Sequence, residues 1–491
     1  MYRWRKTASL YTWGSRALGR LGYGYDEIEP LYRATGREFG VCLPKKVQQL
    51  GSIVISDVVA GGYSFTILTG EGKLIGIGDL ESRSPHRARR RVPQTVDSGV
   101  PEGALAVPLQ RNMPTTHPFR VGGVRNGQGR WVGVPRLGPG PVIHNNSSNN
   151  QGEGEDPASR LVTNPPADPT TTQRPTSDSN GEEETLIPPL THSERAKAKE
   201  LKTYKHTDVT FMSVSSGRQH VLALDYDNNV WLWDWSFAIP GVKLAFPTDD
   251  KQPKIQNAIA GWGYSAVVID KQGIVIWNDV EEKQESLESD TLVLEEADIT
   301  RIPGTSEHKI VDVVAGEHML IFLADRGDIY YINTTANDAL GHRPVLLEGF
   351  KSKLDEGAKF VKLSGSFVKF AAFTDNDKVF MGHRSDMQEN PATAEPRIIP
   401  ELQDVGCISV AVGDHHNLAL LRGGKLLTWG RESKGCGAFG LGKMENVTQK
   451  YGITSEGGGL DLESPTPVEV KGRVLAIAAA GWQSAAVITQ D

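Results

Sequence analysis

ISVAVGDHHNLALLRGGKLLTWG, residues 408–430, contains three apolar runs in which apolar and polar residues alternate. Gly413 separates the first two runs, a Gly-Gly turn separates the second and third, and the stretch ends at Trp429-Gly430. Alternating apolar residues bounded by glycine turns are typical of half-buried antiparallel strands. The stretch therefore predicts a small antiparallel β-unit, and related stretches recur along the chain.

A glycine preceded by small or β-branched residues marks seven copies of this unit. The marker glycines are Gly61, Gly217, Gly261, Gly316, Gly365, Gly413 and Gly481. From Gly217 onward successive markers are 44 to 68 residues apart, whereas Gly61 and Gly217 are separated by 156 residues. In the first six copies a strand is expected to end 17 residues after the marker, beyond a turn rich in Asp, Asn and Gly. Repeats of this period are typical of propellers and solenoids.

The seventh copy is incomplete, because the sequence ends ten residues after Gly481, before a last strand. The missing strand matches the beginning of the sequence, where SLYTWG at 9–14 corresponds to KLLTWG at 425–430. Pairing of the N-terminal and C-terminal strands closes a ring and removes its free strand edges. We therefore expect an all-β protein, a seven-bladed β-propeller closed by its two end strands.

Two copies carry a longer signature after the last strand. The signatures are Trp13-Gly14 followed by Gly19-Arg20-Leu21-Gly22, and Trp429-Gly430 followed by Gly437-Ala438-Phe439-Gly440-Leu441-Gly442. Together with strand starts that carry His220 or His416, these signatures resemble the repeats of the regulator of chromosome condensation family. The resemblance implies a seven-bladed propeller with end-to-end closure, in a diverged form because five copies lack the tail. A WD-repeat propeller is the rival fold, but Trp233-Asp234 is its only well-placed motif.

The composition divides the chain into three parts. Residues 1–79 are expected to hold the closing strand and the first blade, and residues 207–491 the remaining blades. Residues 80–206 are rich in Gly, Pro, Ser, Thr and Asn. Such a segment buries too little apolar surface to offset its chain entropy, which predicts a disordered insertion between blades, with a short helix within 191–204.

Charge and cysteine usage limit the compartment and the partners. The 491 residues carry a formal net charge of −7, which disfavours nucleic acid as a partner. The three cysteines show no paired spacing, and neither a signal peptide nor a membrane-spanning apolar stretch is expected. We expect a cytoplasmic or nuclear protein that is not secreted and has no membrane partner.

Two candidate contact sites have competing interpretations. The basic run Arg87, Arg89, Arg90 and Arg91 is either a nuclear localisation signal or a solvated part of the insertion, and the latter is slightly favoured. Trp231, Trp233 and Trp235 alternate along one predicted strand. We expect Trp231 and Trp233 in the core and Trp235, one residue beyond the strand, as an exposed partner contact.

Catalytic chemistry is not expected. Asp414-His415-His416 suggests a metal or acid–base cluster, but His416 shares its repeat position with His220, Ser64 and Ser484, which predicts a structural hydrogen bond within the blade. No phosphate-binding glycine loop, nucleophile elbow or paired carboxylates stand out. We therefore predict no catalytic, cofactor-binding or metal-binding residue, and a protein that is not an enzyme.

The resemblance supplies two classes of function. Degenerate repeats, a large insertion and a tryptophan-rich second copy are similar to fungal SCF-associated proteins, which join an F-box to such a propeller and present substrates for ubiquitination. An F-box is not expected here, because the first strand begins at Ser9. This reading predicts a protein client and SCF ligase subunits as partners. The alternatives are a guanine nucleotide exchange factor for a Ran-like small GTPase and a scaffold without an enzyme partner.

Overall fold

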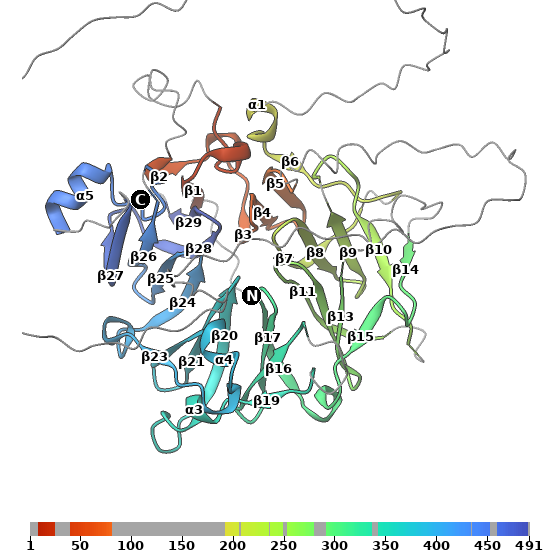
Figure 1. Ribbon diagram of the computed structural model, residues 1–491. Helices are drawn as coiled ribbons and strands as arrows, with labels where there is room; N and C mark the ends of the chain where they lie inside the picture. The colour runs from red at the N-terminus through yellow and green to blue at the C-terminus, as the bar shows by residue number, and fades with distance from the viewer. Residues whose placement is uncertain are drawn as a thin grey trace, which may run out of the picture. The chain divides into compact units, whose positions relative to one another are not determined.

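The protein forms a ring of seven antiparallel sheets in the computed structural model (Figure 1). The structure describes residues 8–24, 40–80, 192–205, 208–234, 236–248, 253–278, 291–335, 342–433, 435–451 and 459–489. Each sheet is a blade, and in six of the seven blades the strands are hydrogen-bonded in chain order from the inside outward, whereas blade seven combines the two ends of the chain.

The first four blades follow one another along the chain, except that β14, which lies between two strands of blade three in the sequence, belongs to blade two. Blade one contains β3 (Ile55–Ala60), β4 (Ser64–Thr69), β5 (Leu74–Gly78) and β6 (Lys199–Glu200). Blade two contains β7 (Phe211–Ser216), β8 (His220–Asp225), β9 (Val230–Asp234) and β10 (Val242–Ala245), with β14 (Thr291–Val293) parallel to β10. Blade three contains β11 (Ile255–Ala260), β12 (Ser265–Ile269), β13 (Gly273–Trp277) and β15 (Ile299–Arg301). Blade four contains β16 (Ile310–Ala315), β17 (Met319–Ala324), β18 (Ile329–Asn333) and β19 (Val345–Leu346).

The remaining blades return to the start of the chain. Blade five contains β20 (Phe360–Ser366), β21 (Lys369–Thr374), β22 (Val379–His383) and β23 (Arg397–Ile398). Blade six contains β24 (Cys407–Val412), β25 (His416–Leu421), β26 (Leu426–Glu432) and β27 (Leu460–Val468). Blade seven contains β28 (Val474–Ala480), β29 (Gln483–Thr489), β1 (Ala8–Gly14) and β2 (Val41–Lys46). The short helices between strands are α1 (His192–Arg195), α3 (Glu348–Lys351), α4 (Arg384–Met387), α5 (Met444–Tyr451) and the 3-10 turns η1 (Ala17–Gly19), η4 (Gln48–Leu50), η6 (Thr305–Glu307), η7 (Pro391–Thr393) and η8 (Pro400–Leu402).

The ends of the chain close the ring, as the sequence predicts. Strand β1 pairs antiparallel with β29, from Ala8 opposite Thr489 to Gly14 opposite Gln483. The innermost strands of neighbouring blades contact one another around the whole circle, in the order β3, β7, β11, β16, β20, β24, β28 and back to β3. The predicted all-β, seven-bladed propeller with end-to-end closure is therefore confirmed.

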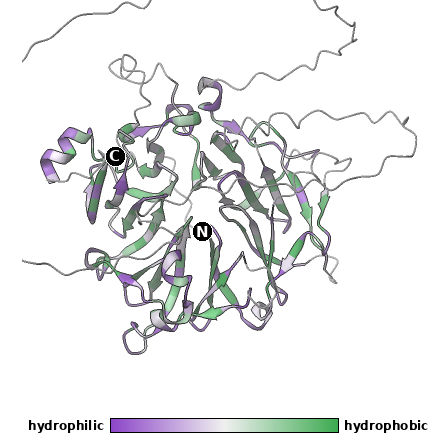
Figure 2. Ribbon diagram, viewed as in Figure 1, coloured by the Kyte–Doolittle hydropathy of each residue, from purple (hydrophilic) through white to green (hydrophobic). Residues whose placement is uncertain are grey.

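The core lies between the blades. The second strand of each blade is buried along nearly its whole length, because each face of a blade packs against a neighbouring blade. Figure 2 shows the corresponding hydrophobic residues along the strands inside the ring. Trp231 and Trp233 are buried against Leu68 and Leu74 of blade one. Both tryptophans thus belong to the inter-blade core.

Part of the segment 80–206, which the sequence assigns to the insertion, belongs to the first blade of the propeller. Strand β6 pairs with β5 as the fourth strand of blade one, and Leu201 beside it is buried. The predicted helix within 191–204 is limited to α1, where Arg195 forms a 3.5 Å ion pair with the buried Asp79. The sequence suggests neither contact, because a two-residue strand leaves no periodic pattern. Residues 81–191, including Arg87, Arg89, Arg90 and Arg91, lie outside the described residues, so the predicted disorder stays a prediction.

Strand pairing defines one equivalent position in every blade, and two of the seven marker glycines lie one residue away from it. In blades one to four and six, the residue before the marker pairs with the residue four after it, as Ala60 pairs with Phe65. In blade five Gly365 itself pairs with Phe370, so Ser366 occupies the marker position. In blade seven Ala479 pairs with Ser484, so Ala480 occupies it. The repeat position is therefore glycine in five blades, and Gly365 and Gly481 flank it in the other two.

Candidate functional site

The loops of the propeller lie on two opposite faces. Because consecutive strands of a blade are antiparallel, the turns after the first strands and the connections after the third strands share one face. We call this the marker face, since the marker glycines lie there. The opposite face carries the turns between second and third strands, and we call it the turn face.

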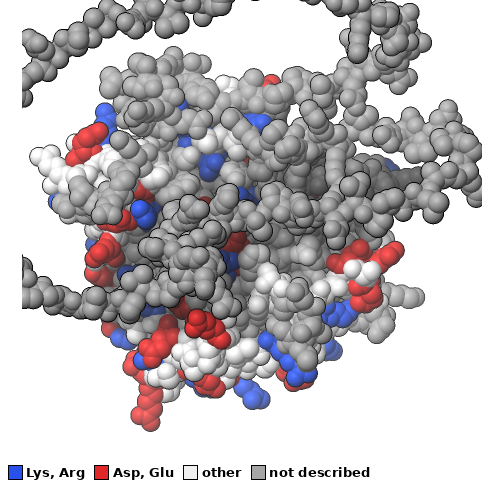
Figure 3. Space-filling model, viewed as in Figure 1, with Lys and Arg blue, Asp and Glu red and all other residues white. Residues whose placement is uncertain are grey.

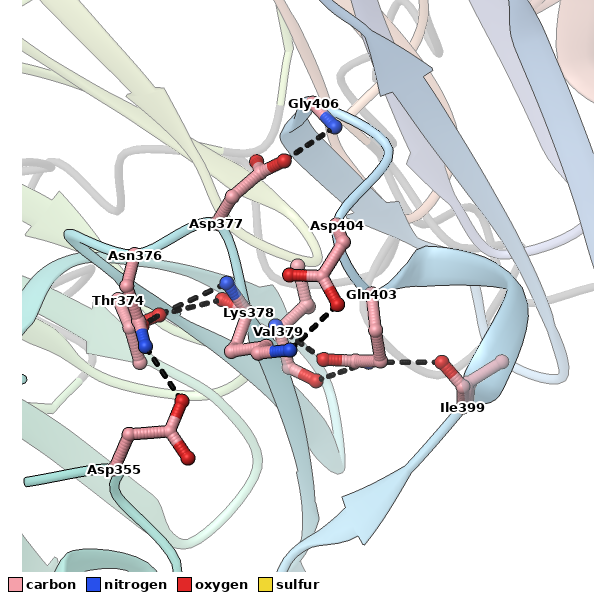
Figure 4. A network of polar contacts seen from close by, with 10 residues as sticks. All are labelled: Asp355, Thr374, Asn376, Asp377, Lys378, Val379, Ile399, Gln403, Asp404 and Gly406. Carbon is pink, nitrogen blue, oxygen red and sulfur yellow. Dashed lines mark hydrogen bonds and ion pairs between the residues drawn. The ribbon is translucent and has the colours of Figure 1, made fainter.

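Polar side chains on the turn face between blades five and six are engaged with one another (Figure 4). Gln403 accepts a 3.1 Å hydrogen bond from the Val379 amide and donates one of 3.0 Å to its carbonyl oxygen. Asp377 accepts a 2.7 Å hydrogen bond from the Gly406 amide, and Lys378 forms a 2.6 Å ion pair with Asp404. These contacts fasten the blade-six entry segment to the hairpin of blade five, which assigns them a structural role.

The marker glycines bring the blades together at the centre. The Gly62 amide donates to the Gly217 carbonyl oxygen of the next blade at 3.3 Å, and the Asp414 amide donates to the Gly481 carbonyl oxygen at 2.9 Å. A Cβ atom on Gly217 would lie 2.3 Å from the Gly261 carbonyl oxygen. Glycine is required there because the backbones of adjacent blades approach too closely for a side chain.

One side chain from each blade follows the repeat position by one or two residues, on the marker face. These seven residues, the hub ring, are Tyr63, Arg218, Trp262, Glu317, Phe367, His415 and Trp482. Arg218 and His415 are exposed and the others are half-buried. The ring therefore presents four aromatic side chains, an arginine and a histidine around the centre of one face.

Contacts among the hub-ring side chains hold them in place. The guanidinium group of Arg218 lies 5.7 Å from the Trp262 ring centroid, and Arg218 Nη2 donates to Tyr63 Oη at 3.5 Å. Trp262 and Phe367, two blades apart, have ring centroids separated by 4.7 Å. Such cation–π and aromatic contacts stabilise a defined arrangement of flat side chains.

Side chains from the outer connections complete these contacts. Arg384 at the start of α4 forms a 2.8 Å ion pair with Glu317, and Arg20 lies 5.1 Å from the Tyr63 ring centroid. His415 and Trp482 have ring centroids 4.8 Å apart. Among the described residues, no ring contact, ion pair or hydrogen bond joins the marker turns of blades five and six, and a pocket opens between those blades.

Two buried histidines connect blades rather than strands of one blade. His220 Nε2 lies 3.0 Å from Ser265 Oγ of blade three, and His416 Nε2 lies 2.8 Å from Ser484 Oγ of blade seven. The expected hydrogen bond within the blade is therefore wrong. By strand pairing, Gln483 takes this repeat position in blade seven, one residue before Ser484. Counting from Gly481 assigns Ser484 to this position instead, because Gly481 lies one residue beyond the equivalent position in blade seven.

Burial keeps both histidines neutral. It lowers the pKa of His220 to about 4 and the pKa of His416 to about 3. Burial also raises the pKa of Asp414 and lowers that of His415. Within the described ranges, no group of three His, Cys, Asp or Glu side chains is placed to hold a metal ion.

The tryptophan-glycine tails connect blades six and seven. Trp13 is fully buried and donates from Nε1 to the Ala438 carbonyl oxygen at 2.9 Å. A Cβ atom on Gly440 would lie 2.7 Å from Trp13 Nε1, so the tail that follows β26 covers this tryptophan. The equivalent Trp429 is buried beside the pocket between blades five and six. Gly14 and Gly430 adopt positive φ values of 104° and 109° where their strands turn.

The structure separates the predicted site residues into three groups. The markers meet at the centre, and Trp231 and Trp233 lie in the core, whereas Trp235 falls outside the described residues. The hub ring was not predicted as a site. Its sequence signal is the position one or two residues after each marker, where aromatic or charged residues recur.

Two further observations describe the surface. The part of the chain that the structure covers contains no helix long and apolar enough to cross a membrane. On the face that Figure 3 shows, acidic and basic side chains are interspersed around the periphery instead of forming a patch of one sign.

Comparisons with known proteins agree with the geometry. Residues 407–436 match the family model described as regulator of chromosome condensation (RCC1) repeat. SCF-associated factor 1 of Saccharomyces cerevisiae is 24% identical over 98% of this chain and 82% of its own length. Guanine nucleotide exchange factor SRM1 of the same yeast is 23% identical over 50% of this chain and 61% of its own length.

A solved structure shows the same fold. Prp20p from Saccharomyces cerevisiae superposes with a TM-score of 0.56 and 12% identity, covering 100% of this chain and 94% of that chain. The family repeat, the distant relatives and the seven-bladed ring lead to one assignment. The chain is a seven-bladed propeller with one segment that matches the regulator of chromosome condensation repeat, and it is distantly similar to SCF-associated factor 1 and to the exchange factor SRM1.

Proposed function

We propose that this chain is a non-catalytic interaction propeller that recognises a client protein for SCF-type ubiquitin-dependent degradation. The observation that carries the proposal is the hub ring, a set of aromatic and arginine side chains held on a rigid scaffold. Tryptophan, tyrosine and arginine dominate the binding energy of protein interfaces. Loops fixed by a stable framework are where recognition residues concentrate.

The choice of an SCF-linked role comes from the relatives. The similarity to SCF-associated factor 1 extends over 98% of this chain, whereas the similarity to the exchange factor SRM1 extends over 50%. Guanine nucleotide exchange on a Ran-like GTPase is therefore the second candidate. Both functions require a protein-binding face and neither requires catalytic residues in the propeller.

Affinity purification from the protein's own cells tests the proposal. We expect SCF subunits and a client that accumulates when the gene is deleted. Substituting both Trp262→Ala and Arg218→Ala removes a stacked pair from the hub ring and should weaken client recovery about 30-fold or more, the effect of losing a hot spot of about 2 kcal/mol. The matched control is Lys378→Ala with Asp404→Ala, which removes an ion pair on the turn face and should leave client recovery unchanged.

The opposite result is equally specific. Recovery of a Ran-like GTPase that is released by added GTP, without SCF subunits, would replace client selection with nucleotide exchange. Circular dichroism and thermal unfolding of each variant must match the wild type, so that loss of binding is not loss of fold.

A further inference from the structure

A pocket in the described part of the chain lies between blades five and six, at the gap in the hub-ring contacts. It is a pocket of about 750 Å³, within the usual range for ligand sites. Blade five supplies Lys369 from β21 and Arg397 from β23. Blade six supplies Asn417 from β25, and the apolar Trp429 and Leu462 form part of its wall.

One buried polar atom in this pocket lacks a partner, and two cationic side chains lie beside it. Asn417 is 4% exposed and donates from Nδ2 to the Trp429 carbonyl oxygen at 3.4 Å, but its Oδ1 accepts no hydrogen bond within the described structure. Lys369 is half-buried, with the charge of Asp414 near its ammonium group, and Arg397 is exposed at the pocket. A buried acceptor without a donor costs about 1–3 kcal/mol, so such groups are unusual unless a ligand satisfies them.

The two cations also disfavour each other. Burial lowers the pKa of Lys369 and the neighbouring Arg397 lowers it further, while Asp414 raises it. An anion placed between the two cations would offset the desolvation of Lys369 and the repulsion between them. A half-buried lysine beside an arginine at the mouth of a pocket is suited to a carboxylate.

The carboxylates around the pocket favour a singly charged anion over a doubly charged one. Asp461 is held by Arg431 at 3.5 Å, and Asp386 accepts a 3.0 Å hydrogen bond from Ser385. Asp386 and Glu463 are exposed at the pocket. These carboxylates repel a dianionic phosphate more strongly than a singly charged carboxylate.

We propose that this pocket binds an acidic side chain of the client protein, whose carboxylate contacts Lys369 and Arg397 while an adjacent backbone N–H donates to Asn417 Oδ1. The proposal rests on the proposed function, because it takes the ligand to be a segment of a protein partner. It adds the chemistry of one recognition position: an Asp or Glu with an extended backbone beside it.

Small model compounds test the pocket independently of any client. The probe is N-acetylglutamate N-methylamide, which has both the carboxylate and the backbone N–H. Methyl resonances of Met381 and Ile399, which line the pocket, report binding in the full-length protein. A ligand of this size is expected to bind with a Kd of about 1 mM.

Three comparison compounds identify the recognised group. N-acetylglutamine N-methylamide lacks the charge and should bind at least about tenfold more weakly, a difference of about 1.4 kcal/mol. Inorganic phosphate should also bind more weakly. N-acetylleucine offers a terminal carboxylate, and stronger binding of that compound would assign the pocket to a chain end and overturn the side-chain assignment.

Variants establish which residues bind. Lys369→Met and Arg397→Gln should each weaken the glutamate probe about tenfold. Lys425→Met, an exposed lysine in the turn between β25 and β26 on the turn face, is the matched control and should have no effect. Equal methyl shifts with the glutamate and glutamine probes, or no shift at about 10 mM of either, would overturn the proposal.

The same variants separate the two proposals. If a client is recovered and Lys369→Met does not weaken it, the pocket assignment fails and the interaction function stands. If no client is recovered but the probe binds, the pocket binds carboxylates and the proposed SCF-linked function fails.

Discussion

At the scale of single residues, the buried histidines act as neutral connectors between blades. His416 reaches Ser484 of the next blade from within the core, and burial lowers its pKa to about 3. A histidine in this position cannot take up a proton while it stays buried, because the core does not solvate the charge. Blade seven places Gln483 at the same repeat position, where Nε2 donates to the carbonyl oxygens of Gly61 and Ser64.

The depressed histidine pKa predicts a specific loss of stability in acid. Below about pH 6.5 the unfolded chain binds protons at His416 that the folded chain does not, so the free energy of unfolding falls as the pH falls toward about 3. His416→Gln removes this proton uptake, and we expect its stability to decline less steeply between about pH 7 and pH 4.5, by about 2 kcal/mol. Denaturant unfolding of both proteins at several pH values measures the difference. Parallel curves would show that His416 titrates normally.

The cysteines predict slow thiol chemistry in the native state. All three are free, and burial raises the pKa of Cys42 to about 11 and of Cys407 and Cys436 to about 12. At pH 8 a thiol with a pKa of 12 is ionised to about one part in 10⁴, and the thiolate is the reactive form. We expect a coloured disulfide reagent to react slowly with the native protein and with all three thiols in denaturant. Rapid reaction of one native thiol would contradict this.

The residue-scale site is the part of the molecule that the sequence predicts least. The markers are visible because Gly217 and its equivalents recur, and backbone contact between blades explains the recurrence. The hub ring varies from copy to copy, so repetition does not reveal it. Contact between Trp262 and Phe367 joins blades three and five across blade four, and no repeat spacing indicates such a contact.

At the scale of elements, the sequence predicts the order of the strands but not always the register in which they pair. The alternating runs predict six hairpins and the closing strand, and the pairing of β1 with β29 confirms the closure. LSGSF and AAAGW each contain adjacent small residues, so either residue can precede the second strand without a steric cost. Backbone pairing places Ser366 and Ala480 at the position that the marker glycine occupies in the other blades. Local composition does not determine this choice, because it depends on contacts across the sheet.

Trp13 is one of the buried side chains that anchor the closing strand β1. This side chain is fully buried and hydrogen-bonded to Ala438, so Trp13→Ala should lower the free energy of unfolding by about 3–5 kcal/mol. Trp13→Phe keeps part of the volume and should cost less. Trp262→Ala, which removes a half-buried tryptophan of the hub ring, is the control and should cost about 1 kcal/mol. Chemical unfolding measures all three, and equal costs for Trp13→Ala and Trp262→Ala would show that β1 does not depend on its tryptophan.

At the scale of the whole molecule, the ring has no fixed beginning. Seven blades pack in a circle, and the chain ends meet inside blade seven only because β1 completes it. Long-range pairing of β1 with β29 closes a loop that includes almost the entire chain. Loop closure over such a length costs conformational entropy, which the buried strand offsets.

A circular permutant tests whether the position of the ends matters. Joining Asp491 to Met1 turns β29 and β1 into a hairpin, and new ends between Leu80 and His192 leave from β5 and β6. We expect this protein to unfold in one cooperative transition at a temperature no lower than the wild type. Every long strand pair is kept, and only the two-residue pairing of β6 with β5 moves to the chain ends.

A second permutant, opened between Lys271 and Gln272, provides the contrast. These residues form the turn that joins the buried strands β12 and β13, so the new ends would separate two strands at the core of blade three. The wild-type ends also lie between a second and a third strand, but β29 and β1 are seven residues long and Trp13 anchors β1, whereas β12 and β13 are five residues long. We therefore expect this permutant to unfold at a lower temperature than the wild type, because a shorter pairing must hold the new ends without a connection. Thermal unfolding of both permutants, followed by circular dichroism, decides the matter. A second permutant that unfolds at the same temperature as the wild type would contradict this expectation and show that the ends can lie within any blade.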